Sequence, residues 1–430
     1  MREIKRDYYL NQLISRRENG AVKIVTGVRR CGKSYLLFEL FRNYLYQNGV
    51  DEKHIIALSL DEEKNRIYRN PEKLNAYIDS QIASDKEQYY VLLDEVQFAI
   101  DDDEIRGKSA PIRLYGVLNG LLRKRNVDIY ITGSNSKFLS SDVMTEFRGR
   151  GDEVRLMPLS FAEFMSVYDG DKQDGYDEYS LYGGLPFVLT KKTDAEKARY
   201  LRDLFKSTYT RDVVERYKLR GNNILENLVD VLASDIGTLT NPNKLANTFV
   251  SNGIKTNERT IASYIEYLED AFIITKAQRY DIKGKRYIGS PMKYYFSDMG
   301  LRNARLNFRQ VEPTHLMENI IYNELLVRGY SVDVGIVESY KTDANSQRVL
   351  VRNEVDFVCN MGSKRYYIQS AFSIPTKEKM QQEEASLNRI SDSFKKILVV
   401  QDRTKPWYND NGYLIINLFD FLLNPNSMEI

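Results

Sequence analysis

The chain has 430 residues, of which 42% are hydrophobic and 28% charged, with a net charge of +2; this predicts two or three domains and excludes a largely disordered chain. Because it has two cysteines and two histidines, a cysteine-based zinc site is excluded and a histidine-based metal site is not expected. The first residues form no signal-peptide core and no apolar run reaches membrane-spanning length, so we expect a soluble, cytoplasmic protein.

The first motif follows a short apolar run, Ile24 and Val25, which predicts a buried strand. It reads Gly27-Val-Arg-Arg-Cys-Gly-Lys-Ser34 and precedes a run with helical periodicity, so it matches the phosphate-binding loop G-x-x-x-x-G-K-[ST] between a strand and a helix. The glycines let backbone N–H groups turn inward as an anion nest, and the helix N-terminus adds positive potential. Lys33 is expected to reach the β- and γ-phosphates of ATP, and Ser34 to bind Mg²⁺. The predicted nucleotide-binding residues are Gly27, Arg29, Arg30, Cys31, Gly32, Lys33 and Ser34.

A second motif ends the apolar run at residues 89–95. Its last two residues are Asp94 and Glu95, as a Walker B strand requires. Asp94 is expected to hold Mg²⁺ through water, and Glu95 to orient and deprotonate the attacking water. The alternative is a strand that ends in two solvated acids, and the phosphate-binding loop upstream favours the catalytic interpretation.

Three further residues are candidates for contacts with the γ-phosphate. Asn135 follows the predicted strand 127–133, where an amide can contact the γ-phosphate or the attacking water. Arg148 and Arg150 lie among glycines, and a mobile arginine can neutralise the charge of the transition state. Each has a plainer interpretation, as a turn-forming Gly-Ser-Asn or as ordinary loop arginines. The sequence leaves open whether either arginine acts in its own subunit or in a neighbour.

These motifs occur together with Gly149-Arg-Gly151, Pro158-Leu-Ser-Phe-Ala-Glu-Phe164 and Tyr182-Gly-Gly-Leu-Pro186. In this order they resemble a large prokaryotic family of AAA+-like ATPases, in which a C-terminal domain of unassigned function follows the ATPase domain. The resemblance spans nearly the whole chain. It implies ATP binding on an AAA+-type α/β core with a parallel sheet, followed by a small helical lid.

The middle of the chain predicts a winged helix. Residues 244–250 and 258–269 have helical periodicity and are separated by a turn that contains Gly253, which is the layout of a helix-turn-helix. A hairpin around Gly284 would form the wing. Between Lys276 and Arg309 there are nine Lys or Arg and two Asp, with tyrosines among them, so residues 244–309 are a candidate DNA-binding segment. The alternatives are a helix-turn-helix that contacts protein, and tyrosines that belong to the core.

In the last third of the chain, an amphipathic helix at 316–328 is followed by predicted strands at 349–358, 366–372 and 396–401. This order resembles the PD-(D/E)xK nuclease fold. The positions that match the nuclease motif are Glu318, Asp356, Gln369 and Ala371. Because Ala371 stands where the motif has a lysine, we expect an inactive nuclease-like domain unless Lys364 or another side chain replaces that lysine.

The sequence therefore predicts four parts: an ATPase core at 1–158, a helical lid at 159–221, a winged-helix domain at 222–310 and a restriction-endonuclease-like α/β domain at 311–430. The favoured function is a Mg²⁺-dependent ATPase that acts as a regulator or a DNA-associated switch. The alternatives are an ATP-regulated, metal-dependent nuclease and an ATP-bound signalling scaffold without nucleic acid. A homo-oligomer remains open.

Overall fold

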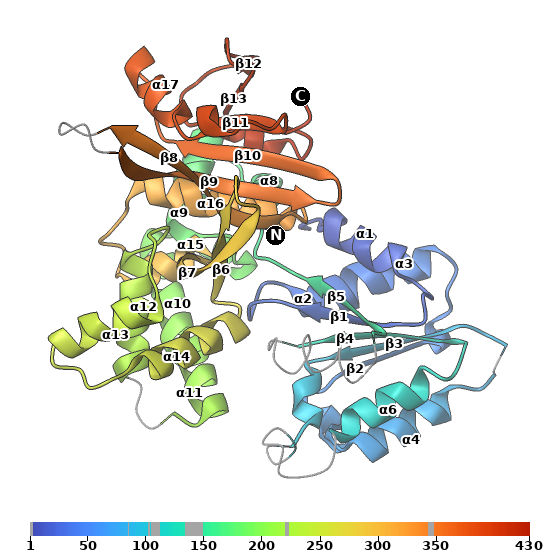
Figure 1. Ribbon diagram of the computed structural model, residues 1–430. Helices are drawn as coiled ribbons and strands as arrows, with labels where there is room; N and C mark the ends of the chain where they lie inside the picture. Colours follow the sequence, from blue (N-terminus) through green and yellow to red (C-terminus); the bar gives the residue numbers. More distant parts are fainter. Residues whose placement is uncertain are drawn as a thin grey trace. The chain divides into compact units, whose positions relative to one another are not determined.

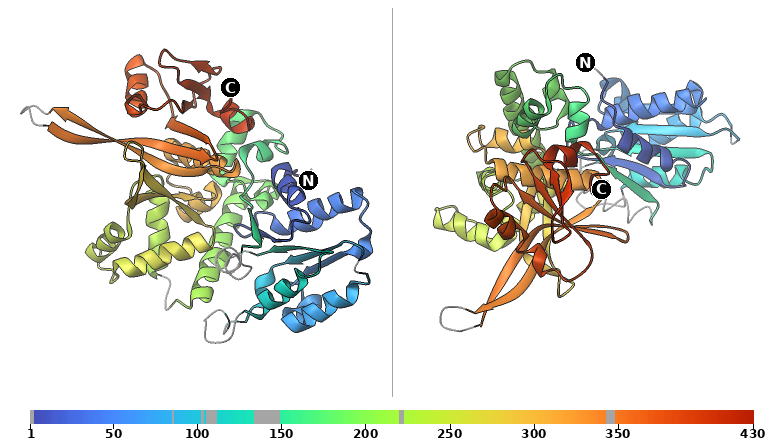
Figure 2. Two further views of the ribbon diagram at one scale, coloured as in Figure 1. Left: turned by 45° about the vertical axis from the view of Figure 1, so that its right-hand side comes forward. Right: turned by 90° about the horizontal axis from the view of Figure 1, so that it is seen from above.

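The computed structural model describes residues 3–84, 86–101, 104, 112–133, 149–219, 223–342 and 348–430. These residues form two compact units (Figures 1 and 2). The N-terminal unit comprises residues 3–158 and 270–272, and the C-terminal unit comprises residues 159–269 and 273–430. No helix of the described part of the chain combines the length and the apolar character needed to cross a membrane.

The N-terminal unit is a five-stranded parallel sheet with the order β2-β3-β4-β1-β5. Every residue of β1, β3 and β4 is buried, as expected for parallel strands with helices on both faces of the sheet. Helices α1 and α3 lie on one face, and α4 and α6 lie on the other (Figure 1). The strands are β1 (Val22–Thr26), β2 (Ile55–Ser59), β3 (Tyr89–Asp94), β4 (Val127–Thr132) and β5 (Gly151–Arg155). The helices are α1 (Asp7–Ser15), α2 (Lys33–Tyr35), α3 (Arg42–Gln47), α4 (Pro71–Gln81) and α6 (Arg113–Leu121).

This strand order positions the predicted site. β3, β4 and β1 are neighbours and run in the same direction, so their carboxyl ends meet at one edge of the sheet. The phosphate-binding loop follows β1, and the Asp-Glu pair ends β3. The predicted parallel α/β sheet of the ATPase core is confirmed.

The C-terminal unit contains an eight-stranded mixed sheet with the order β12-β13-β11-β10-β9-β8-β6-β7. Helix α16 packs against β7 to β10 on one face, and an apolar cluster centred on Val337, Val355 and Leu398 covers the other. β8 and β9 form a long hairpin (Figure 2). The strands are β6 (Ile274–Asp281), β7 (Arg286–Phe296), β8 (Ser331–Thr342), β9 (Arg348–Met361), β10 (Lys364–Ala371), β11 (Lys395–Val400), β12 (Trp407–Tyr408) and β13 (Leu414–Asn417).

Two of the described helices of this unit, α8 and α10, begin at capping boxes. Ser160 with Glu163 and Thr193 with Glu196 form capping boxes, in which each side chain satisfies a backbone N–H of the first turn. The helices are α8 (Phe161–Met165), α9 (Lys172–Tyr182), α10 (Asp194–Leu204), α11 (Arg211–Tyr217), α12 (Asn223–Ser234), α13 (Pro242–Ser251), α14 (Glu258–Asp270), α15 (Met299–Arg305), α16 (Pro313–Val327), α17 (Lys377–Glu384) and α18 (Leu418–Leu423).

The boundary between the two compact units after residue 158 coincides with the predicted end of the ATPase core. The three predicted parts that follow it lie within one compact unit. Helices α13 and α14 occupy the two segments expected for a helix-turn-helix, and β6 and β7 form the expected hairpin. However, β6 also pairs with β8, so this hairpin belongs to the same sheet as the strands of the last third. A boundary at residue 310 therefore does not separate two sheets.

Candidate nucleotide-binding site

The phosphate-binding loop depends on backbone conformations that favour glycine. Gly27 has φ +138° and Gly32 has φ +104°. A Cβ on Gly27 would lie 2.1 Å from the carbonyl oxygen of Leu156, so the loop fits against the end of β5 only without a side chain here. Gly32 is the residue before α2, where its left-handed conformation turns the chain into the helix.

Lys33 points back across the loop. Its side chain is buried, and its Nζ donates hydrogen bonds to the carbonyl oxygens of Gly27 at 3.1 Å and Val28 at 3.3 Å. The ammonium group is thus held on the concave side of the loop, where phosphate oxygens would bind. Arg29 is half-buried and Arg30 is exposed.

The loop is also anchored from behind. The Sγ of Cys31 lies 3.5 Å from the carbonyl oxygen of Leu156, and burial raises the pKa of the Cys31 thiol. Arg6, which precedes α1, donates to the carbonyl oxygens of Cys31 at 3.2 Å and Met157 at 2.7 Å. Cys31 therefore packs the loop rather than presenting a reactive thiolate to solvent.

Asp94 lies directly beside the loop. It is 3% exposed and receives hydrogen bonds from the hydroxyls of Thr132 and Ser34, and from Ser59 Oγ at 3.2 Å. Burial raises the pKa of Asp94, and the hydrogen bonds from Thr132 and Ser34 oppose this rise because they favour the carboxylate. The structure therefore brings together Ser34 and Asp94, which are 60 residues apart in the chain.

Glu95 is oriented by two neighbours that the sequence analysis did not identify. It has a left-handed backbone with φ +52°, and its N–H donates to Thr132 Oγ1 at 3.1 Å. Gln97 Nε2 donates to its carboxylate Oε2. Thr132 thus connects both acids of the pair to β4. The signal in the sequence was a hydroxyl residue at the carboxyl end of the strand.

The residues present fit the Mg²⁺ ion that the phosphate-binding loop implies. A hydroxyl and a carboxylate meet beside the loop, and oxygen atoms are the ligands that Mg²⁺ prefers. In the described ranges, no group of three or more His, Cys, Asp or Glu side chains is arranged to hold a metal by itself. Water and phosphate oxygens would therefore complete the coordination shell.

Three further candidates in this unit were predicted to contact the γ-phosphate. Asn135 and Arg148 lie outside the described residues. Arg150 is exposed, its Nη2 lies 3.5 Å from Asn119 Oδ1, and its carbonyl oxygen accepts from Val22 N at 2.8 Å. Arg150 is therefore level with the start of β1, roughly 16 Å along the strand from the phosphate-binding loop. This placement contradicts an action of Arg150 at the loop of its own subunit; action in a neighbouring subunit stays a prediction.

The nuclease-like positions form a second, separate cluster. Glu318 of α16 accepts hydrogen bonds at its Oε1 from Lys293 Nζ at 2.9 Å and from the Tyr295 hydroxyl at 2.6 Å. Lys293 also forms an ion pair of 2.6 Å with Glu354. Asp356 accepts from Ser370 N at 2.8 Å, and its pKa is raised well above the ordinary value by burial and by the negative charge of Glu318.

Lys293 is the cation of this cluster, and sequence analysis did not identify it. It comes from β7, whereas the nuclease motif would place its lysine at the buried Ala371 of β10. Gln369 is near the cluster: its Oε1 is 3.4 Å from Asp356 N. Lys364 is roughly 16 Å along β10 from Gln369 and forms an ion pair of 2.6 Å with Glu429, so it does not replace the missing lysine.

Part of the basic excess of residues 276–309 is not available at the surface. Arg279 and Arg302 are buried, and four others form ion pairs with carboxylates: Lys276 with Glu269, Arg286 with Asp281, Lys293 with Glu318 and Arg305 with Asp230. Tyr294 and Tyr295 are also buried, and Tyr287 is exposed. The exposed cations are concentrated at the turn between β6 and β7, namely Lys283, Lys285 and Arg286.

The fold and the first site define the class of this protein. A parallel sheet with a phosphate-binding loop after β1 and an Asp-Glu pair at the end of β3 is the architecture of a P-loop ATPase domain of the AAA type. Residues 19–165 match the family described as AAA domain. Residues 173–312 match a family described as domain of unknown function (DUF8612).

The full length of the chain has relatives. It is 34% identical over 428 residues to an uncharacterized protein of Haemophilus influenzae, with 98% of each chain covered, and it therefore belongs to the same family as that protein. It is 27% identical to the uncharacterized protein MJ1544 of Methanocaldococcus jannaschii, over 93% of this chain and 85% of the relative. Among solved structures, the Walker-type ATPase PABY2304 of Pyrococcus abyssi aligns with a TM-score of 0.49 and 16% identity, over 71% of this chain and 96% of the other.

Proposed function

We propose that the N-terminal unit binds ATP with Mg²⁺ and hydrolyses it. The observation that supports this most strongly is the meeting of Lys33, Ser34 and Asp94 at one edge of the sheet. An ammonium group, a hydroxyl and a buried carboxylate are the groups that a magnesium-bound polyphosphate requires. When bound, Mg²⁺ neutralises phosphate charge that develops during transfer.

The protein's own residues have distinct roles in this proposal. The N–H groups of the loop and the Lys33 ammonium hold the phosphates, and Ser34 with Asp94 provides oxygen ligands. Glu95 accepts the proton of the attacking water, and Gln97 fixes the direction of its carboxylate. Asn135 and Arg148 remain candidates for contacts with the γ-phosphate.

Two variants separate binding from chemistry. Lys33→Ala should abolish both ATP binding and phosphate release, whereas Glu95→Gln should bind ATP and release phosphate at least 100-fold more slowly, since a positioned general base contributes about 10²- to 10⁴-fold. Lys53→Ala, an exposed lysine of the same unit, is a matched control. Undiminished hydrolysis in Lys33→Ala would contradict the proposal.

We further propose that the C-terminal unit is a nuclease-like scaffold that does not cleave nucleic acid and that responds to the nucleotide state. The supporting observation is Lys293, which places an ammonium between Glu318 and Glu354. A divalent cation there would meet a fixed positive charge within about 3 Å of its ligands, and like charges repel strongly at such distances. We therefore expect no Mg²⁺ ion at this cluster.

The competing function, an ATP-regulated nuclease, is tested by the same residues. Single-stranded and duplex DNA should remain intact with Mg²⁺ or Mn²⁺ in the presence of ATP. Cleavage that disappears in Asp356→Ala would establish the nuclease and overturn our proposal.

If the unit contacts DNA, we expect the contact at the turn between β6 and β7. The triple variant of Lys283, Lys285 and Arg286 to Ala should then lower both the DNA affinity and its dependence on salt.

A further inference from the structure

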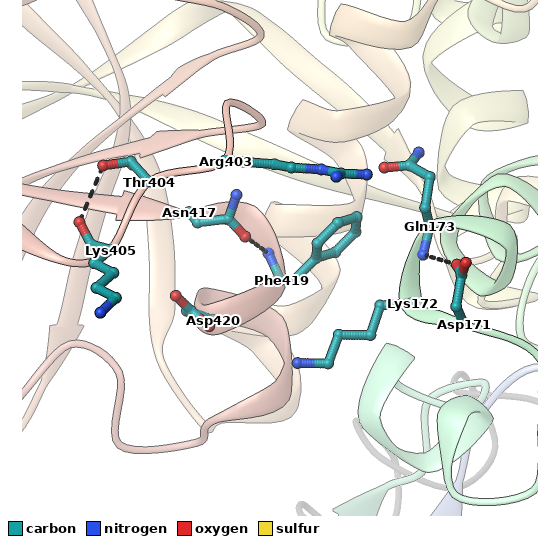
Figure 3. Close-up of a pocket in the computed structure, with 9 residues that line it drawn as sticks. All are labelled: Asp171, Lys172, Gln173, Arg403, Thr404, Lys405, Asn417, Phe419 and Asp420. Atoms are coloured by element: carbon teal, nitrogen blue, oxygen red, sulfur yellow. Dashed lines mark hydrogen bonds between the residues drawn. The ribbon is translucent and has the colours of Figure 1, made fainter.

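A cavity in the C-terminal unit carries positive charge that the described residues do not neutralise. It is a shallow pocket of about 530 Å³, within the range of small-molecule sites, and it is largely open to solvent. Three segments line it: the start of α9 (171–173), the loop after β11 (403–405) and the start of α18 (417–420) (Figure 3). We call it the α9–α18 pocket. It is formed entirely by the C-terminal unit and contains no residue of the phosphate-binding loop.

Three cations surround this pocket. The side chains of Lys172, Arg403 and Lys405 are exposed, and none of their nitrogens has a hydrogen bond or ion pair with a described residue. Two carboxylates, Asp171 and Asp420, also line it, so the net charge is +1. Asp171 Oδ1 is already engaged, because it accepts the N–H groups of Gln173 at 2.8 Å and Asp174 at 2.9 Å. The pocket therefore favours an anionic ligand.

The floor of the pocket is an aromatic ring. Phe419 is half-buried, and its inner side packs on Phe161 and Tyr176, with ring centroids 6.2 Å and 5.7 Å apart. Figure 3 shows this ring between the side chains of Arg403 and Lys172. A planar ring of a ligand can stack on Phe419, and the flat guanidinium of Arg403 can bind a phosphate with two parallel hydrogen bonds.

The walls are fixed before any ligand binds. Asn417 accepts the N–H of Phe419 at 2.8 Å and donates to the carbonyl oxygen of Asp402 at 2.6 Å, so it connects α18 to the loop that carries Arg403. Asp402 in turn accepts the N–H of Ile374 at 2.7 Å and the Ser373 hydroxyl at 3.0 Å. A backbone held in this way loses little entropy on binding, and the ligand mainly orders the exposed side chains.

We propose that the α9–α18 pocket binds a nucleoside monophosphate. A phosphate suits the cations Arg403, Lys172 and Lys405, and a base suits the ring of Phe419. The ribose hydroxyls can donate to Asp420, the one lining carboxylate that does not cap a helix. This site is additional to the phosphate-binding loop and is independent of ATP hydrolysis.

The test uses the full-length Lys33→Ala protein, in which the phosphate-binding loop is disabled, and AMP without Mg²⁺ as the probe. Isothermal titration calorimetry at low salt should show saturable binding of one AMP. Arg403→Ala and Phe419→Leu should each weaken this binding at least tenfold, whereas Lys377→Ala, an exposed lysine of α17, should leave it unchanged. Thermal melting of each variant checks that the fold is intact.

Two companion ligands test the chemical class. Ribose 5-phosphate lacks the base and adenosine lacks the phosphate, so both should bind at least tenfold more weakly than AMP. Absence of saturable AMP binding, or equal binding by Arg403→Ala, would overturn the proposal. Equal affinity for inorganic phosphate and AMP would overturn the assignment to a nucleotide.

Discussion

Replacing Thr132 with Val tests how the Asp-Glu pair is held. Thr132 is fully buried; its hydroxyl donates to Asp94 and accepts the N–H of Glu95. Valine has the same shape without the hydroxyl, so the variant loses one hydrogen bond to a carboxylate and leaves one N–H without a partner. Each loss costs about 1–3 kcal/mol, so the free energy of unfolding should fall by about 2–6 kcal/mol.

The same change should slow ATP hydrolysis, because both acids lose their common support. We expect kcat/KM to fall about 10- to 100-fold, which corresponds to about 1.4–2.8 kcal/mol of transition-state stabilisation. Urea unfolding and steady-state phosphate release measure the two effects. Thr132→Ser keeps the hydroxyl and should recover most of the activity. The reasoning is refuted if Thr132→Val hydrolyses ATP like the wild type, or if Thr132→Ser is as impaired as Thr132→Val.

Three further predictions concern other parts of the chain. Gly27→Ala should abolish ATP binding, as judged by calorimetry, because its Cβ would meet the carbonyl oxygen of Leu156 at 2.1 Å. Burial raises the pKa of Asp298 to about 6. Protonation of this carboxyl should therefore raise the free energy of unfolding by up to about 3 kcal/mol as the pH falls from 7 to 4. Urea titrations of Asp298→Asn should lack this contribution. Lys293→Met should cost about 3–5 kcal/mol in urea unfolding because it leaves buried carboxylates without a counter-ion, whereas Lys276→Met, at an exposed pair, should cost under about 1 kcal/mol.

The placement of the phosphate-binding loop and of Asp94 was largely predictable because the main signals are local in sequence. The loop from Gly27 to Ser34 has its glycines, lysine and hydroxyl at fixed spacings, and the strand and helix around it are equally local. Asp94 followed from the same logic at the end of an apolar strand. Thr132 was missed because its role depends on β4 lying beside β3, which no pattern within β4 reveals.

The C-terminal unit was less predictable because its cluster joins distant segments. Lys293 lies 25 residues from Glu318 in the chain and contacts it only because β7 packs against α16. Counting charges between Lys276 and Arg309 suggested a basic surface, but fully buried residues such as Arg302 contribute nothing to it. The count could not distinguish a surface arginine from one that donates to the carbonyl oxygen of Ala233 inside the fold. Strand β8 was also missed, and it is the strand that joins the hairpin of β6 and β7 to β9.

The most direct test of the account is equilibrium binding of ATP to the purified full-length protein in the presence of Mg²⁺. The wild type should bind one ATP per chain, with an affinity that falls at least tenfold when Mg²⁺ is chelated, in Ser34→Ala and in Asp94→Asn, and binding should be undetectable in Lys33→Ala. No measurable binding to the wild type, or equal affinity in all four proteins, would contradict the central claim that this edge of the sheet holds a magnesium-bound nucleotide.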